Sequence, residues 1–340
     1  MKYFEDSLIL KALPVKRAAY SDRTAWLMAE LSRLVYETLP GENSLQRKIE
    51  KVYTLVEEKK DKKDVETLIK EAIELNEEDS KIEKILQKAQ FSFLSSFNEK
   101  GTQAMLVKLN KTEEFDGMLV LVFRGTEPTS LEDIKTDIKA NLVPSGKGGR
   151  IHKGFKESFE LIEKRLEEEL AKYESEKLPL YITGHSLGGA LALVAAKYMC
   201  SDSTGAVYTF GGPRVGDDEF FENIKTPVYR LVNQADAVPR LPFGAGFNYF
   251  LAFIDFIPIN GTKRITAWLR KHFSGFTHKG TMVFLGEDKG EVVVKNSPSI
   301  FWRSPYIFPR LLQTKFKATF QDHSITEYCD KLQRYAHKRN

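Results

Sequence analysis

One serine in the sequence stands in a pattern that suits nucleophilic chemistry. Residues 184–188 read Gly-His-Ser-Leu-Gly, which places Ser186 between Gly184 and Gly188. In a nucleophile elbow the serine occupies a strained turn between a strand and a helix, where side chains in place of the flanking glycines would clash. The N-terminus of the following helix can then stabilise a developing oxyanion. The pattern is short, so it predicts a serine nucleophile only if a strand precedes it and a helix follows.

The neighbouring sequence supplies both elements. The apolar run at 178–183 is typical of a buried strand, and the alanine-rich residues 188–200 are typical of a helix. Similar runs predict strands at 103–109, 118–123, 206–210, 228–232, 281–285 and 291–294, with helices at 155–174 and 217–224. Strands that alternate with helices predict an α/β fold with a mostly parallel central sheet flanked by helices.

The N-terminal part of the chain has a different pattern. Residues 21–38 place apolar side chains on one helical side after a Ser-Asp start signal. The charged stretch 44–90 also carries apolar residues at helical spacing, and the charge run at 57–64 is typical of an exposed surface. We therefore divide the chain into an N-terminal helical segment at 1–90, packed on or inserted before the core, and a catalytic domain at 91–340.

Several stretches together resemble the class 3 lipases, which are α/β-hydrolases that cleave acylglycerol and related esters. The stretches lie at 122–134, 152–155, 182–192, 208–220 and 232–242. Their order and spacing match the family as well as their letters do. The resemblance implies a fungal-lipase-like α/β-hydrolase fold over about 100–340. The helical segment at 44–90 and an apolar insertion at about 243–275 are additions to the family's pattern.

A serine hydroxyl needs a base, and the base needs an orienting acid. In this fold the three follow the chain order serine, acid, histidine. The resemblance assigns the acid to Asp236, in the motif Asn-Gln-Ala-Asp-Ala-Val-Pro that follows the strand at 228–232. The alternative interpretation is a surface-turn aspartate before Pro239.

Histidine is the expected base, and the chain offers several. The six histidines are His152, His185, His272, His278, His323 and His337. The first two precede Asp236, and we expect them to be structural, by packing or hydrogen bonding near the site. His272 lies in the apolar insertion, and His337 lies in a basic tail.

Two histidines then remain as candidates for the base. The family places its base in a loop just before a last helix, which favours His323, because apolar residues at helical spacing follow it directly. His278 instead precedes a strand, and it stays the alternative.

An oxyanion hole needs two donors. One is expected to be the backbone N–H of Leu187, the residue after the nucleophile. By resemblance the other is Thr126, through its backbone N–H and its hydroxyl. The alternative for Thr126 is a turn residue after Gly125.

Two apolar segments are candidates for contact with substrate. The family carries a lid helix after the oxyanion loop, here at 130–142, and its apolar side would present Leu131, Ile134 and Ile138. Many members carry a tryptophan in this lid and none occurs here, so strong interfacial activation is not expected.

The second segment, 243–260, is rich in large apolar groups, among them Phe243, Phe247 and Phe250. It fits a buried core helix, an acyl-chain binding surface or a membrane contact, and the basic residues at 263–271 would suit a lipid surface.

Composition narrows the classes of function. The formal net charge of +4 is too small to indicate a nucleic-acid-binding protein. The two cysteines form no disulfide framework, and no metal-binding motif occurs, so we expect no cofactor and no metal. The N-terminus lacks the pattern of a secretory signal, and no apolar run is long enough to span a bilayer, so a cytoplasmic location with peripheral lipid contact is expected.

The sequence therefore predicts a serine ester hydrolase acting on acyl lipids, of the lipase or phospholipase A type, with esterase activity on short esters. Ser186, His323 and Asp236 would form and hydrolyse an acyl-enzyme without a cofactor. Two alternatives stay open. One is a lipase-like scaffold that binds partners, and the other is an acyl hydrolase acting on thioesters.

Overall fold

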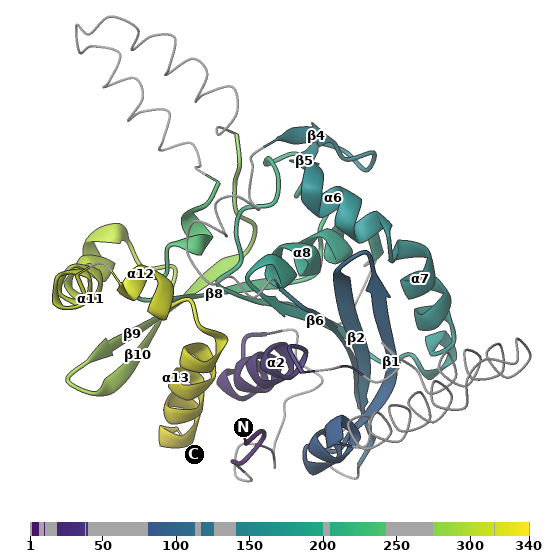
Figure 1. The fold of residues 1–340 in the computed structure, drawn as a ribbon, viewed down its shortest axis with the longest axis horizontal. Coiled ribbons are helices and arrows are strands. Elements are labelled where there is room, and N and C mark those ends of the chain that lie inside the picture. The colour runs from purple at the N-terminus through teal and green to yellow at the C-terminus, as the bar shows by residue number, and fades with distance from the viewer. Residues whose placement is uncertain are drawn as a thin grey trace, which may run out of the picture.

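The computed structural model describes most of the chain (Figure 1). The described residues are 2–6, 10, 19–37, 39, 81–112, 117–125, 141–199, 205–242, 275–315 and 317–339. Several predicted features lie outside them: Thr126, most of the lid helix with Leu131, Ile134 and Ile138, residues 44–80, and the insertion with Phe243, Phe247 and Phe250. Within the described part, no helix is long and apolar enough to cross a membrane.

A central eight-stranded sheet has the strand order β1-β2-β3-β6-β7-β8-β9-β10. Its strands are β1 (Phe91–Glu99), β2 (Thr102–Leu109), β3 (Met118–Phe123), β6 (Leu180–His185), β7 (Val207–Phe210), β8 (Val228–Asn233), β9 (Thr281–Asp288) and β10 (Glu291–Asn296). The pairings from β3 to β9 are parallel, whereas β1, β2 and β10 join antiparallel at the edges. The sheet is mostly parallel, as predicted, and the fold is that of an α/β-hydrolase.

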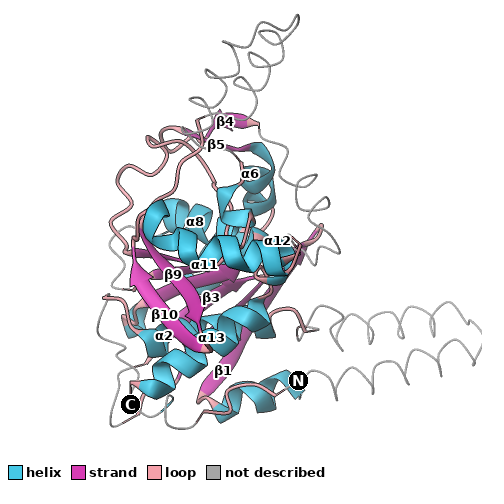
Figure 2. Cartoon of the chain, turned by 90° about the vertical axis from the view of Figure 1, so that its left-hand side faces the viewer, coloured by secondary structure: helices cyan, strands magenta, loops and turns pink. Residues whose placement is uncertain are grey.

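Helices cover both faces of this sheet (Figure 2). On one face lie α6 (Lys153–Glu160), α7 (Glu163–Ala171) and α8 (Leu187–Met199), and on the other lie α2 (Asp22–Leu34) and α13 (Ile325–Lys338). Each face has its own buried cluster of apolar side chains. The helices α11 (Ile300–Gln313) and α12 (Ala318–Gln321) lead from β10 to α13.

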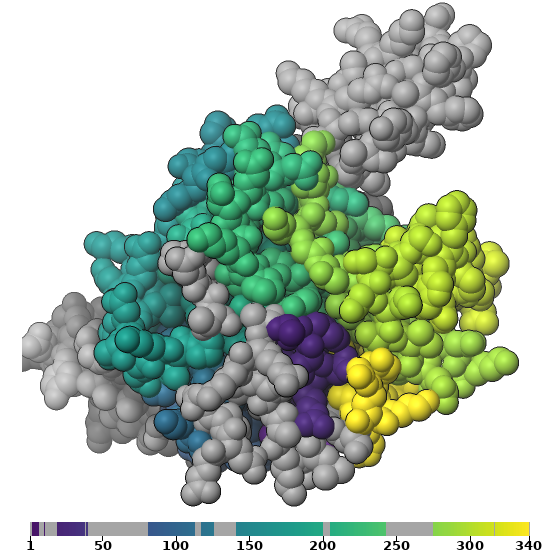
Figure 3. All heavy atoms as spheres, turned by 180° about the vertical axis from the view of Figure 1, so that it is seen from behind, coloured from purple at the N-terminus to yellow at the C-terminus, as the bar shows by residue number. Residues whose placement is uncertain are grey.

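The helix α2 begins as the sequence predicts. Ser21 caps it by accepting a hydrogen bond from the backbone N–H of Thr24. The Ser32 hydroxyl meets the Thr183 hydroxyl of β6 at 3.0 Å, so α2 lies directly against the strand that precedes the predicted nucleophile. Seen from behind, α2 (purple) lies beside the C-terminal helix (yellow) (Figure 3).

Three predicted helices differ in the structure. The helix expected at 155–174 is divided into α6 and α7. Residues 218–223 form turns instead of a helix, because Asp217 holds the Phe220 N–H with its side chain and Asn223 takes a left-handed φ of 65°. The lid helix cannot extend to Leu142, since Leu142 pairs with His152 in the hairpin of β4 (Leu142–Pro144) and β5 (Arg150–His152).

Candidate active site

Ser186 lies at a sharp turn between β6 and α8. Its φ is +56°, a left-handed conformation that is strained for a residue with a side chain. A Cβ on Gly184 would lie 2.3 Å from the backbone of Gly188, and a Cβ on Gly188 would lie 2.3 Å from the carbonyl oxygen of Phe123. Both flanking glycines are therefore required by close backbone approach, which confirms the local structure predicted from the motif.

Ser186, His323 and Asp236 form one hydrogen-bonded chain. His323 Nε2 lies 2.9 Å from Ser186 Oγ, and His323 Nδ1 lies 3.0 and 3.1 Å from the two carboxylate oxygens of Asp236. Because the carboxylate can only accept, Nδ1 carries the proton and Nε2 is free to accept the serine proton. All three side chains are buried. The structure thus brings together the three residues selected from the sequence.

The carboxylate of Asp236 has partners besides His323. The Tyr328 hydroxyl donates to Asp236 Oδ2 at 2.6 Å, and the backbone N–H of Val238 donates to Oδ1 at 2.9 Å. Burial, followed by the charge of Asp236, raises the pKa of Tyr328 well above its usual value, so this hydroxyl keeps its proton. These hydrogen bonds hold the carboxylate in its buried position. In the sequence Tyr328 is one of the residues at helical spacing that follow His323, and that spacing gives no sign of this hydrogen bond.

A second histidine supports the loop that carries His323. His185 Nε2 donates to the backbone carbonyl of His323 at 2.6 Å, so His185 Nδ1 must accept, and the Tyr36 hydroxyl donates to it at 3.0 Å. Burial and then His323 lower the pKa of His185 well below its usual value, so the ring is neutral at pH 7. This agrees with the structural role expected for His185 near the site.

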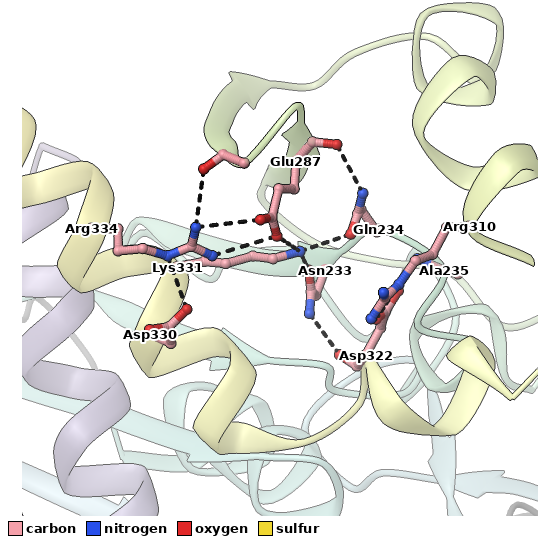
Figure 4. A network of polar contacts seen from close by, with 10 residues as sticks. Asn233, Gln234, Ala235, Glu287, Arg310, Asp322, Asp330, Lys331 and Arg334 are labelled. Carbon is pink, nitrogen blue, oxygen red and sulfur yellow. Dashed lines mark hydrogen bonds and ion pairs between the residues drawn. The ribbon is translucent and has the colours of Figure 1, made fainter. Parts of the chain in front are cut away.

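A buried polar network joins the turn before Asp236 to the turn before His323 (Figure 4). Lys331 Nζ donates to the side-chain oxygens of Asn233 and Gln234, at 2.8 Å each. The Asn233 side chain in turn donates to the backbone carbonyl of Asp322 at 3.0 Å. The last turns before the proposed acid and base are thus tied to one another.

Asp322 completes this network. It is fully buried, and its carboxylate accepts the Ala235 N–H at 3.0 Å and two hydrogen bonds from Arg310 at 2.8 and 3.2 Å. Arg310 thereby links α11 to the turn that precedes His323. No short motif in the sequence marks these residues.

His278, the alternative candidate for the base, lies against the turn that follows Asp236. His278 Nε2 donates to the backbone carbonyl of Pro239, and burial together with Arg230 and Arg214 lowers its pKa well below the usual value. His152 is buried in β5, with its ring stacked on Phe155 at 4.2 Å. Of the histidines in the described residues, His323 is the one that reaches both Ser186 and Asp236.

The oxyanion hole is described only in part. Leu187 is the first residue of α8, and the N–H groups of a first helical turn have no partner within their own helix. Gly125 passes so close to the site that a Cβ there would lie 2.6 Å from the His185 carbonyl oxygen and 3.3 Å from Ser186 Cβ. The residue before Thr126 thus borders the proposed nucleophile, and the roles of Thr126 and Leu187 stay predictions.

A family model matches the part of the chain that holds the proposed nucleophile and the proposed acid. Residues 120–245, which hold Ser186 and Asp236, match the family model described as lipase (class 3). Over this segment the chain is similar to the class 3 lipases. The resemblance inferred from the motifs is confirmed here. The match ends at residue 245, before His323.

Individual relatives match over limited lengths. A "Secreted mono- and diacylglycerol lipase 1" of Fusarium solani is 41% identical over 102 residues, covering 28% of this chain and 30% of the relative. "Phospholipase A1-Igamma1, chloroplastic" of Arabidopsis thaliana is 38% identical over 92 residues, covering 23% and 18%. A solved Rhizomucor miehei lipase propeptide complex aligns with a TM-score of 0.46, at 26% identity over 62% of each chain. The matches span about a third of the length of the curated lipases.

Proposed function

We propose that the protein is a serine ester hydrolase acting on acyl lipids through an acyl-enzyme intermediate. The observation that carries the proposal is the hydrogen-bonded chain from Ser186 Oγ through His323 to Asp236, with the serine in a left-handed turn between strand and helix. The class 3 lipase match over the segment that holds the serine and the acid supports the same chemistry.

In this mechanism Ser186 Oγ attacks the acyl carbon while His323 Nε2 accepts its proton. The imidazolium that forms is stabilised by the Asp236 carboxylate at Nδ1 and then donates its proton to the leaving alcohol. Water attacks the acyl-enzyme in the second half of the reaction, with His323 again as the base. The hydrogen bonds from Tyr328 and Val238 hold the carboxylate toward the imidazole throughout.

The tetrahedral intermediate carries a negative oxygen. We assign its donors to the backbone N–H of Leu187 and to Thr126. Loss of one such donor typically costs about 3–4 kcal/mol of transition-state stabilisation. Because β6 ends and α8 begins on either side of Ser186, the positive end of the α8 dipole also faces this oxygen.

The acyl-lipid class is supported by the relatives, which include one named as a mono- and diacylglycerol lipase and one named as a phospholipase A1. We assign Leu131, Ile134, Ile138, Phe243, Phe247 and Phe250 to substrate contact.

The cytoplasmic location expected from the sequence gains no support from the relatives, one of which is named as secreted.

Substrate profiling tests the proposal. Purified protein and its Ser186→Ala variant are assayed on short soluble esters, a triacylglycerol emulsion, phospholipid vesicles and an acyl thioester. We expect ester hydrolysis that depends on Ser186, and the preferred lipid distinguishes lipase from phospholipase A. Hydrolysis of none of them by a well-folded protein would contradict the proposal and favour the partner-binding scaffold. Cleavage of the thioester alone would favour the second alternative, an acyl hydrolase that acts on thioesters.

A further inference from the structure

A group of basic side chains gathers beside the turn that follows Asp236. It consists of Arg214, Arg230, Arg240, Arg303 and His278, which we call the arginine cluster. They come from the segment after β7, from β8, from the 3-10 turn Val238–Arg240, from α11 and from the segment before β9. Four arginines far apart in sequence thus bring positive charge to one region, beside a histidine that is neutral at pH 7.

Hydrogen bonds and strand register place the members together. Arg214 Nη1 donates to the carbonyl oxygens of Arg240 and of Pro242, the latter at 2.6 Å. His278 donates to the carbonyl of Pro239, in the same turn.

The other two members meet at the sheet. Arg230 pairs with Met282 across β8 and β9, and Arg303 Nη1 lies 3.7 Å from the sulfur of that same Met282. Met282 is thus the strand neighbour of Arg230 and the side-chain contact of Arg303, and the charge of Arg303 acts on Arg230.

The charges of these groups are not balanced within the described residues. Burial and then Arg240 lower the pKa of Arg214 to about 10, whereas burial, Arg214 and Arg303 lower that of Arg230 to about 10. Burial and Arg240 likewise lower the pKa of Arg303. Among the described residues, the carboxylate that acts on a member of the cluster is Asp236, on Arg240, and it is engaged by His323. All four arginines still carry a charge at pH 7, so they repel one another.

Several nitrogens in the cluster have no hydrogen-bond partner. Arg230 Nε and Arg303 Nε are buried donors that meet no acceptor of the described protein. His278 Nδ1 is buried without a donor, and it is an acceptor because Nε2 carries the proton. A buried donor left without a partner destabilises the folded protein, most of all when it is charged. Like charges and unpaired donors at one place are both relieved by a bound anion.

We propose that the arginine cluster is a binding site for a phosphate group. Planar guanidinium groups bind phosphate oxygens in a bidentate manner, and several of them together suit a doubly charged tetrahedral anion better than a carboxylate. The phosphate comes either from the head group of a phospholipid or from free phosphate. A phospholipid head group as the source rests on the proposed function, the hydrolysis of acyl lipids.

The outer side of α11 gives the lipid source a physical basis. Phe301, Phe308 and Leu312 are 85%, 62% and 71% exposed, on the helix that also carries Arg303. Over 292–321 the sequence has basic residues but no aspartate or glutamate. Arg310 of this helix is paired with Asp322, whereas Arg303 has no carboxylate partner among the described residues. A helix that carries exposed apolar groups beside such an arginine suits an anionic lipid surface.

Binding is measured on the full chain carrying Ser186→Ala, so that the result does not depend on catalysis. Inorganic phosphate is titrated by calorimetry at constant ionic strength, and thermal melts are recorded with phosphate and with chloride. We expect saturable binding and a melting temperature that rises with phosphate and not with chloride. No saturation at millimolar phosphate would overturn the proposal.

Variants locate the site. Arg230→Gln and Arg303→Gln should each weaken phosphate binding about tenfold or more, because a charge-assisted hydrogen bond is lost. Arg230→Gln should keep or raise the melting temperature without phosphate, since it removes repulsion, which separates loss of binding from loss of folding. The matched control is Arg165→Gln on α7, whose partner is Glu99. An equal loss of phosphate binding in Arg165→Gln, or unchanged phosphate binding by both cluster variants, would contradict the assignment of the site to the arginine cluster.

The two sources are separated with vesicles. Phosphatidylcholine vesicles with and without phosphatidic acid are mixed with the Ser186→Ala protein and with its Arg230→Gln derivative, and sedimented. Phosphatidic-acid-dependent binding that Arg230→Gln weakens supports a lipid head group. Binding of inorganic phosphate without any vesicle effect assigns the site to free phosphate. Either result is independent of whether the protein hydrolyses esters.

Discussion

Gly211 occupies the one position in the described site where a methyl group would separate the proposed acid from the proposed base. Its φ is +61°, and a Cβ there would lie 2.7 Å from Asp236 Oδ2, 2.9 Å from His323 Nδ1 and 3.0 Å from His323 Cε1. Ordinary contact begins at 3.4 Å, so Gly211→Ala must displace the Asp236 carboxylate by 3.4 − 2.7 = 0.7 Å or move the backbone.

The size of the effect follows from this displacement. A misplacement near 1 Å typically costs about 10²-fold in rate, and loss of the orienting acid's correct hydrogen bond costs about 10⁴-fold. We therefore expect Gly211→Ala to lower kcat on a soluble ester by about 10² to 10⁴. Alanine in a left-handed conformation also costs about 1–2 kcal/mol of folding stability.

The neighbouring glycine is the matched control. A Cβ on Gly212 would come no closer than 3.5 Å to any atom, and its φ lies outside the left-handed region. Gly212→Ala should therefore keep kcat within a fewfold of the wild type. Steady-state kinetics and thermal melts on both variants are the measurement. A Gly211→Ala protein with nearly full kcat would refute the geometric reasoning, and so would equal losses in the two variants.

Three further perturbations test the surroundings of the site. Tyr36→Phe removes the hydroxyl that donates to His185 and should lower the free energy of unfolding by about 1–3 kcal/mol in urea titrations, because a buried acceptor loses its donor; an unchanged midpoint would argue against that hydrogen bond. His323→Ala should lower kcat about 10⁴-fold or more, whereas His278→Asn should act through stability, and the reverse order would exchange the two histidines. The folded-state pKa values of His185 and His278 lie below the usual 6.5, so below pH 6.5 the unfolded chain binds more protons than the folded chain. The free energy of unfolding should therefore decrease as the pH is lowered below 6.5, by about 1.4 kcal/mol per pH unit for each histidine. Replacing His185 by Gln should reduce that slope, and an unchanged slope would contradict the assignment.

Local patterns in the sequence predict the nucleophile well. Gly184 and Gly188 are needed because backbone atoms approach within a few ångströms of them. Such a requirement is visible in the sequence, because both glycines lie two residues from Ser186. The neighbouring strand β3, Met-Leu-Val-Leu-Val-Phe, is continuously apolar and fully buried, so its sequence predicts a strand. The sequence does not predict β1, because its residues mix phenylalanine with serine and lie at an edge of the sheet.

The surroundings of the triad could not be predicted in the same way. Asp236 and His323 were selected through the family resemblance, not through spacing. Tyr36 reaches His185 across 149 positions of the chain, and Tyr328 reaches Asp236 across 92. Such partners are set by how α2 and α13 pack against the sheet, and a single sequence carries no local signal of that packing.

Covalent labelling tests the central claim most directly. A fluorophosphonate forms a stable adduct with an activated serine, and the labelled peptide is identified by mass spectrometry. We expect one adduct, on Ser186, which disappears in Ser186→Ala and is slowed strongly in His323→Ala, while thermal melts show both variants folded. Labelling that persists in folded Ser186→Ala, or that falls on another serine, would contradict the assignment of Ser186 as the nucleophile.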